Sequence, residues 1–344
     1  MRQSRLHNLT TRVTALLRDE RLRQNRWVQR AVAAGWLLLS VALVVWFSGS
    51  LQRSWLQLAS YRFTWRLGYV WPALLCYGLA QALLTLNWSL VARRVGAGVP
   101  WRNTLTAYSY SFFLSGLPGG FWNIFSLFYF YAALGVSRSL VLLGAVIEQV
   151  SMLLAGVLIC IVIVPFTLQP VLGGWTYGGA ALGLALLGLG AAPPVWQRML
   201  GALARLRPFA ALGNATLRFR DMALWVALQV GAILASCLLA FFCVNVMQPL
   251  PLDSLPLVVA SWSLIITISA LVYWVPGTSG LQLGLSLFIF STFLDPPIVL
   301  ALLVMLRLVR IAGSSAAVVV AFALVDLPRF ASRKTTQARS RSEQ

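Results

Sequence analysis

Acidic residues, lysine and histidine are scarce in this sequence. Its 344 residues include 8 aspartates and glutamates, one histidine (His7) and one lysine (Lys334). The four cysteines stand inside apolar runs and form no CxxC or Cys/His cluster, which is typical of small buried hydrophobic side chains. They are Cys76, Cys160, Cys237 and Cys243. Without a Ser/His/Asp set, a carboxylate pair or a phosphate-binding loop, we expect no enzyme, no cofactor and no metal site.

Charged residues of both signs are also rare, and apolar residues take their place. Charged residues make up 10% of the chain and hydrophobic residues 59%, whereas a soluble domain has about a quarter of its residues charged. Several apolar runs exceed the roughly 20 residues that a helix needs to cross the hydrocarbon core of a bilayer. The composition therefore predicts an all-α polytopic membrane protein.

The formal net charge of +19 does not indicate a nucleic-acid partner. The arginines stand at the ends of apolar runs and do not form a stripe with interleaved aromatic residues. In membrane proteins this distribution marks cytoplasmic segments, where guanidinium groups meet lipid phosphates. We therefore expect anionic lipid headgroups as partners and no nucleic acid.

The most basic segments set the predicted orientation. Residues 1–30 carry eight arginines and residues 326–344 form a basic tail, so both are expected on the cytoplasmic side. Segment 1–30 also has leucines at helical spacing, which is typical of a helix that lies on an anionic membrane surface. The connection 193–221 is basic as well. We expect a multi-pass protein of the inner (plasma) membrane with both termini in the cytoplasm.

Counting crossings between these basic segments predicts two helical hairpins that enter and leave on one side. The apolar segments of spanning length are 31–51, 68–92, 139–165, 172–192, 222–247 and 296–325. The orientation then requires 104–133 and 255–294 to be re-entrant hairpins. Residues 31–165 and 166–325 would each contain two spans, a hairpin and a span. The prediction is six spanning helices plus two re-entrant hairpins in an inverted repeat, the plan of many transporters.

Each predicted hairpin is broken by proline and glycine. The first break is Pro118-Gly119-Gly120, and the second is Pro276-Gly277. After each break a new helix would begin inside the bilayer, where its free N–H groups could bind an anion.

The second break is followed by polar and small residues that could serve such a site. Thr278 or Ser279 could cap the new helix, and Gly280 and Gln282 follow. The simpler alternative is a pair of ordinary Pro-Gly kinks whose N–H groups bond to neighbouring helices or water.

Three charged residues fall in the middle of predicted spans. Glu148 lies in segment 139–165, and Arg307 and Arg310 lie one turn apart in segment 296–325. A charge near the bilayer centre costs about 2.5–3.5 kcal/mol on insertion scales, so such residues are usually paired and functional. We expect Glu148 to pair with Arg307, either within a functional site or only to fix helix packing.

The two breaks and the residues after them resemble a known family. Leu117 to Gly120, then Leu134 to Ser137 and a span with Glu148, are similar to the first conserved region of the lysylphosphatidylglycerol synthase transmembrane region, also called the flippase-like membrane domain. Val275 to Gly284 and the segment Leu306 to Arg310 are similar to the second region. The resemblance covers most of residues 31–325. Asn123, Ser126 and Gln282 stand where the family usually has charged residues.

The resemblance implies movement of an anionic lipid between leaflets. We expect a flippase-like protein that translocates an anionic phospholipid or a lipid-linked intermediate, without the synthase domain of some family members. The alternative is a non-transporting membrane anchor or regulatory partner of a separately encoded glycosyltransferase or lipid synthase. A second copy of the chain is a further candidate partner.

Overall fold

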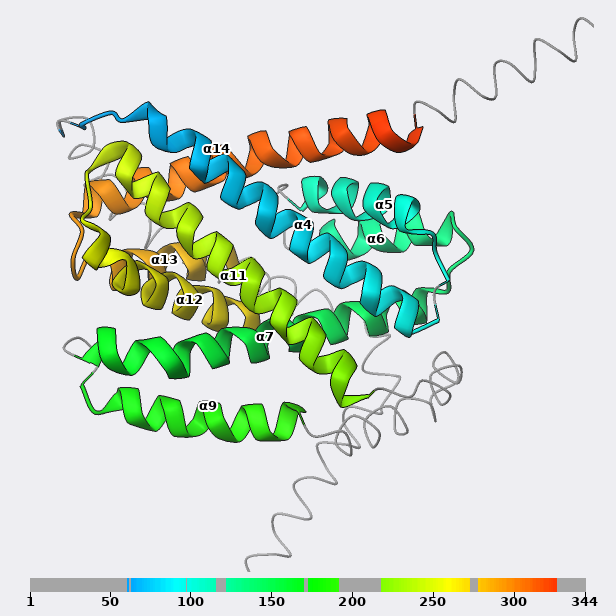
Figure 1. Ribbon diagram of the computed structural model, residues 1–344, viewed down its shortest axis with the longest axis horizontal. Helices are drawn as coiled ribbons and strands as arrows, with labels where there is room; N and C mark the ends of the chain where they lie inside the picture. The colour runs from blue at the N-terminus through cyan, green and yellow to red at the C-terminus, as the bar shows by residue number, and fades with distance from the viewer. Residues whose placement is uncertain are drawn as a thin grey trace, which may run out of the picture. The chain divides into compact units, whose positions relative to one another are not determined.

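The computed structural model describes residues 61, 63–96, 98–115, 122–169, 173–191, 218–272 and 278–326. All of them belong to one compact unit, Leu58–Gln344. They contain helices and no strands, as the composition predicts (Figure 1). The helices are η1 (Leu67–Tyr69), α4 (Val70–Arg94), α5 (Trp101–Leu114), α6 (Trp122–Ala132), α7 (Arg138–Thr167), α9 (Trp175–Ala191), α11 (Phe219–Met247), η3 (Leu252–Ser254), α12 (Leu255–Leu271), α13 (Thr278–Phe290), α14 (Pro296–Ala321) and η4 (Phe322–Asp326).

Five helices of the described residues are long and apolar enough to cross a membrane. They are Leu67–Arg94, Arg138–Thr167, Phe219–Met247, Leu252–Leu271 and Pro296–Val325. Their length and composition indicate a multi-pass membrane protein. Four of the five coincide with predicted spans. The fifth, η3 with α12, has 20 residues and lies where the sequence predicts the first limb of a hairpin. The predicted span 172–192 forms α9, which has 17 residues.

The helix ends agree with the predicted breaks. Helix α5 ends at Leu114 and α6 begins at Trp122, on either side of the first break. Helix α12 ends at Leu271 and α13 begins at Thr278, on either side of the second. Proline and glycine disfavour a continuous helix at both places. Several predicted features lie outside the described residues: segment 1–30, span 31–51, the breaks 116–121 and 273–277, and the tail from residue 327.

The long helices pack closely through small residues. Helices α4 and α11 lie side by side and antiparallel, with Leu83 against Gly231 (Figure 1). Gly144 of α7 lies against Trp88 of α4, so an added Cβ would be 3.2 Å from that indole ring. Small residues allow such close approach of helices where lipid leaves no hydrophobic drive for association.

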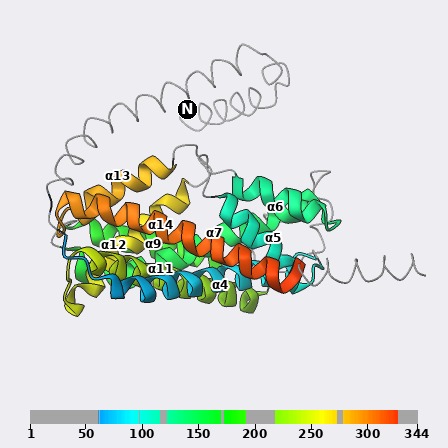
Figure 2. The ribbon, with the colours of Figure 1, turned by 90° about the horizontal axis from the view of Figure 1, so that it is seen from above.

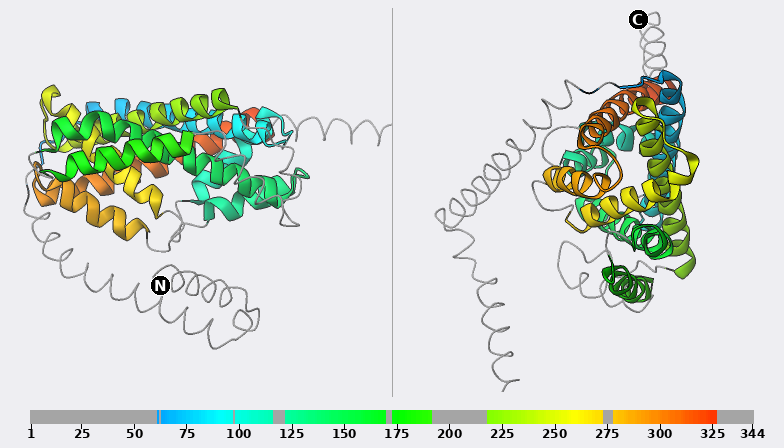
Figure 3. Two further views of the ribbon diagram at one scale, coloured as in Figure 1. Left: turned by 90° about the horizontal axis from the view of Figure 1, so that it is seen from below. Right: turned by 90° about the vertical axis from the view of Figure 1, so that its left-hand side faces the viewer.

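Helices α5 and α6 lie near the first half of α7, and α12 lies against its second half. Near its end, Val164 clusters with Ala260 of α12. Near its start, Val141 clusters with Ala107 of α5 and Leu127 of α6. Figures 2 and 3 accordingly show α5 and α6 at one end of the long helices and α12 and α13 at the other. Helix α14 contacts both α13 and α5.

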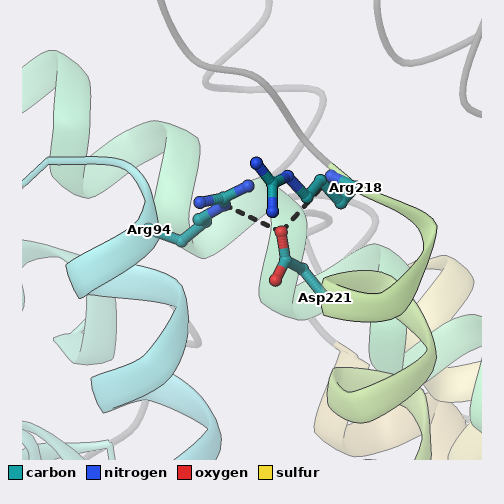
Figure 4. A network of polar contacts seen from close by, with 3 residues as sticks. All are labelled: Arg94, Arg218 and Asp221. Atoms are coloured by element: carbon teal, nitrogen blue, oxygen red, sulfur yellow. Dashed lines mark hydrogen bonds and ion pairs between the residues drawn. The ribbon is translucent and has the colours of Figure 1, made fainter.

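Polar contacts mark the two ends of the α4–α11 pair. At one end the Arg94 guanidinium (Nε) lies 2.7 Å from the Asp221 carboxylate, which also accepts a hydrogen bond from the Arg218 backbone N–H (Figure 4). At the other end the Tyr61 hydroxyl donates to the Asp295 carboxylate at 3.3 Å. Burial, and then the negative charge of Asp295, raise the pKa of Tyr61. Both contacts lie outside the apolar middle of the helices.

Gly156 is expected to be essential for the packing of α7 on α12. A Cβ at this position would overlap the Thr267 side chain, whose hydroxyl already donates to the Ser263 carbonyl at 2.7 Å. Overpacking of this kind costs about 1–3 kcal/mol, so Gly156→Ala should lower the thermal unfolding midpoint in detergent.

The matched control is Gly178→Ala in α9, where a Cβ would meet nothing within 4 Å. Alanine favours a helix over glycine by about 0.5–1 kcal/mol, so this variant should match or exceed the wild-type midpoint. Equal midpoints for the two variants would show that α7 and α12 do not touch at Gly156.

Candidate functional site

Two adjacent residues in the middle of α7 form hydrogen bonds to two different helices, α5 and α12. Glu148 accepts a hydrogen bond of 2.8 Å from the Tyr108 hydroxyl of α5. Gln149 donates one of 2.8 Å to the Ala270 carbonyl of α12. That carbonyl is among the last four of its helix, which lack the usual partner four residues later. The middle of α5 and the end of α12 therefore meet at one turn of α7.

Aromatic rings surround the Glu148 contact. The Tyr108 ring stacks on Trp88 of α4 on one side, with ring centroids 5.9 Å apart, and on Phe112 on the other, at 6.3 Å. The Trp88 indole N–H donates to the Tyr131 hydroxyl of α6 at 2.7 Å, and both of these side chains are fully buried. These contacts fix the direction of the Tyr108 hydroxyl toward the carboxylate.

The same row of rings leads to Arg310 on α14. Its guanidinium carbon lies 5.1 Å from the centre of the Phe112 ring, a cation–π geometry. One guanidinium nitrogen donates to the Ser115 hydroxyl at 2.7 Å. Ser115 is the last described residue before the first break. Arg310 thus contacts the last turn of α5, on the same helix face as Tyr108.

The predicted pairing of Glu148 with Arg307 is wrong. Within the described residues no ion pair joins the two, and Glu148 instead accepts from Tyr108. Arg307 is exposed, whereas Arg310 is partly buried. Three residues advance a helix position by about 300°, roughly 60° short of a full turn, so Arg310 can lie at the edge of the packed face while Arg307 lies beyond it. Arg310 packs toward α5 and Arg307 points away from it.

The other predicted site residues are only partly described. Pro118, Gly119, Gly120, Pro276 and Gly277 lie outside the described residues. Thr278 and Ser279 lie in the first turn of α13, and their side chains, for which the sequence predicts a capping role, are not described.

Further along α13, the structure leaves room beside the second break. Gly280 has open space where a Cβ would be, and Gln282 is partly buried, its carbonyl accepting from Ser286. Neither residue makes a described contact with Glu148, Arg307 or Arg310.

The structure adds polar and aromatic residues that the site prediction omitted. They are Trp88, Tyr108, Phe112, Ser115, Tyr131 and Gln149. One sequence signal could have identified two of them: Phe112 and Ser115 stand within two turns of the first break. Among the described residues, no three His, Cys, Asp or Glu side chains could together hold a metal ion.

Removing the Tyr108 hydroxyl tests the Glu148 contact. Tyr108→Phe keeps both ring stacks but leaves the carboxyl without its donor, and an unsatisfied buried group costs about 1–3 kcal/mol. The variant should therefore lower the thermal unfolding midpoint in detergent. Tyr108→Phe combined with Glu148→Gln should lose less than the sum of the two single losses.

Tyr129→Phe is the control, because Tyr129 is 73% exposed on α6. It should leave the midpoint unchanged. Strictly additive losses for Tyr108 and Glu148 would show that their contact does not contribute to stability.

No protein-family model and no curated protein matches this chain. The function is therefore inferred from the chemistry and placement of these residues.

Proposed function

We propose that this protein is a flippase-like membrane protein that moves an anionic phospholipid or a lipid-linked intermediate between leaflets. One observation carries the proposal. The middle of α5 and the end of α12, each next to an interruption in its helix pair, meet at Glu148 and Gln149 of α7, and Arg310 lies at the edge of the first interruption.

Helix lengths support a re-entrant hairpin for α5–α6, whereas η3 with α12 has 20 residues and α13 has 13. Helix α7 has 30 residues, or about 45 Å at 1.5 Å per residue, enough to cross a hydrocarbon core of about 30 Å. Helix α5 has 14 residues and α6 has 11, or about 21 and 17 Å. Neither could cross alone. If α7 spans the bilayer, α5–α6 would enter from one face and α12–α13 from the other.

This reading gives the inverted repeat that the sequence predicts. Each half would contain a long helix (α4 or α11), a hairpin and a further span (α7 or α14), and α4 packs antiparallel to α11. In transporters with this plan, the substrate site lies at the repeat interface near the bilayer centre, and the repeats rock around it. With span 31–51 and α9 included, the count is the predicted six spans.

The charge of the helix interiors favours an anionic substrate. Among the described helices, charged side chains more than three residues from an end are Glu148, Arg307 and Arg310. Arg307 points away from α5, so Arg310 is the cationic donor that faces the region between α5 and α14. A lipid phosphate that enters this region could exchange its hydration for charge-assisted hydrogen bonds from Arg310 and the Ser115 hydroxyl.

The resemblance of both breaks to the flippase-like membrane domain supports the same function. Under this proposal the Arg-rich segments 1–30 and 326–344 lie in the cytoplasm, and the protein resides in the plasma membrane. The end of α4 with Arg93 and Arg94, and the start of α5 with Arg102, would then face the cytoplasm.

Lipid translocation by purified protein tests the proposal. The protein is reconstituted in liposomes with a fluorescent phosphatidylglycerol, and dithionite quenching reports which leaflet the lipid occupies. Wild type should equilibrate this lipid faster than a fluorescent phosphatidylcholine. Arg310→Gln should slow it roughly tenfold to a hundredfold, the loss expected for one hydrogen bond to a charged group.

Arg102→Gln is the matched control, since it removes an exposed arginine from the outer end of α5. It should transport at the wild-type rate. If wild-type protein is no faster than empty liposomes with any anionic lipid, the protein is better described as an anchor or regulatory partner. If Arg310→Gln transports normally, Arg310 is not part of the substrate site.

A further inference from the structure

The outer face of α14 is the most open of the candidate spans. Only 22% of the most apolar 18-residue stretch of this helix is buried inside the protein, against 39–67% for the corresponding stretches of the other four candidate spans. Val304, Leu308 and Ile311 are each more than half exposed, at 51%, 56% and 52%. Their spacing of four and three residues places them on one face of the helix. In a bilayer this face meets lipid.

Arg307 lies within this apolar face. It is three residues after Val304 and four before Ile311, and its side chain is exposed. It stands about 17 Å from the start of α14 at 1.5 Å per residue, so it is far from either end of the span. Arginines keep their charged heads in water by snorkelling when they lie near the ends of membrane helices. At this depth a charge needs a counterion.

No described residue neutralises Arg307. The Glu148 carboxylate accepts from Tyr108, and the Asp221 carboxylate pairs with Arg94. Arg307 has neither an ion pair nor a hydrogen bond from its side chain within the described ranges. The acids of segment 1–30, Asp19 and Glu20, stand among eight arginines. The counterion is therefore best supplied from outside the protein.

We propose that Arg307 binds the phosphate of a resident anionic phospholipid on the outer face of α14. The guanidinium offers paired N–H donors that match phosphate oxygens. The exposed side chains of Val304, Leu308 and Ile311 provide an apolar surface for the acyl chains. The site is separate from Arg310, which faces α5, and it requires only that α14 spans the membrane. It can exist whether or not the protein transports lipid.

Native mass spectrometry of protein purified with equal phosphatidylglycerol and phosphatidylcholine tests this site. Wild type should retain a phosphatidylglycerol molecule through detergent exchange. Arg307→Gln should bind it roughly tenfold to a hundredfold more weakly. Arg307→Lys keeps the charge without the paired donors and should bind with intermediate affinity. Arg102→Gln, which removes an exposed arginine outside α14, should keep the lipid.

Three results would overturn the inference. Arg307→Gln could retain phosphatidylglycerol as wild type does. The retained lipid could be lost only from Arg310→Gln, which would place it in the transport site. Finally, Arg307→Gln could convert a dimer to a monomer with bound lipid unchanged, which would mean that a second copy covers this face. The translocation rate of Arg310→Gln is measured separately in liposomes, so the two proposals can fail separately.

Discussion

The arrangement of the helices depends on one turn in the middle of α7. Two neighbouring side chains there make hydrogen bonds to two different short helices: Glu148 to Tyr108 of α5, and Gln149 to Ala270 of α12. Hydrogen bonds between helices are among the few specific forces available where both lipid and side chains are apolar. They hold the middle of α5 and the end of α12 at one turn of α7. Arg310 completes the grouping through Ser115 and Phe112 of α5.

Features that depend on local sequence could be predicted. The lengths of α4, α7, α11 and α14 follow from uninterrupted apolar runs, and the ends of α5, α6, α12 and α13 follow from proline and glycine at the two breaks. The need of Glu148 for a polar partner could also be predicted, because a carboxyl in the middle of an apolar helix is costly unless it is paired.

Features that depend on helix rotation could not be predicted in the same way. The sequence predicts Arg307 as the partner of Glu148, but packing turns Arg307 outward and Arg310 toward α5. The residues around Arg310 nevertheless indicate which face of α14 packs against other helices. Leu306 and Ser314 are buried, each four residues from Arg310, and Gly313 lies against Tyr77 of α4. Small residues in an apolar helix mark its packed face, and Arg310 shares that face. The partner of Glu148 was harder to predict from the sequence, because tyrosine is common both at membrane interfaces and in protein cores.

The depth of the inner helix ends in a bilayer tests the central claim most directly. Single spin labels can replace Phe113 near the end of α5 and Leu271 at the end of α12, both exposed. Labels at Trp101 and Leu252, the exposed outer ends, serve as references. Power saturation with oxygen and a nickel chelate should place the two inner labels at similar depth near the bilayer centre, and the outer labels near its two opposite surfaces. If either inner label lies at the surface opposite its outer reference, that helix crosses the membrane and the account is wrong.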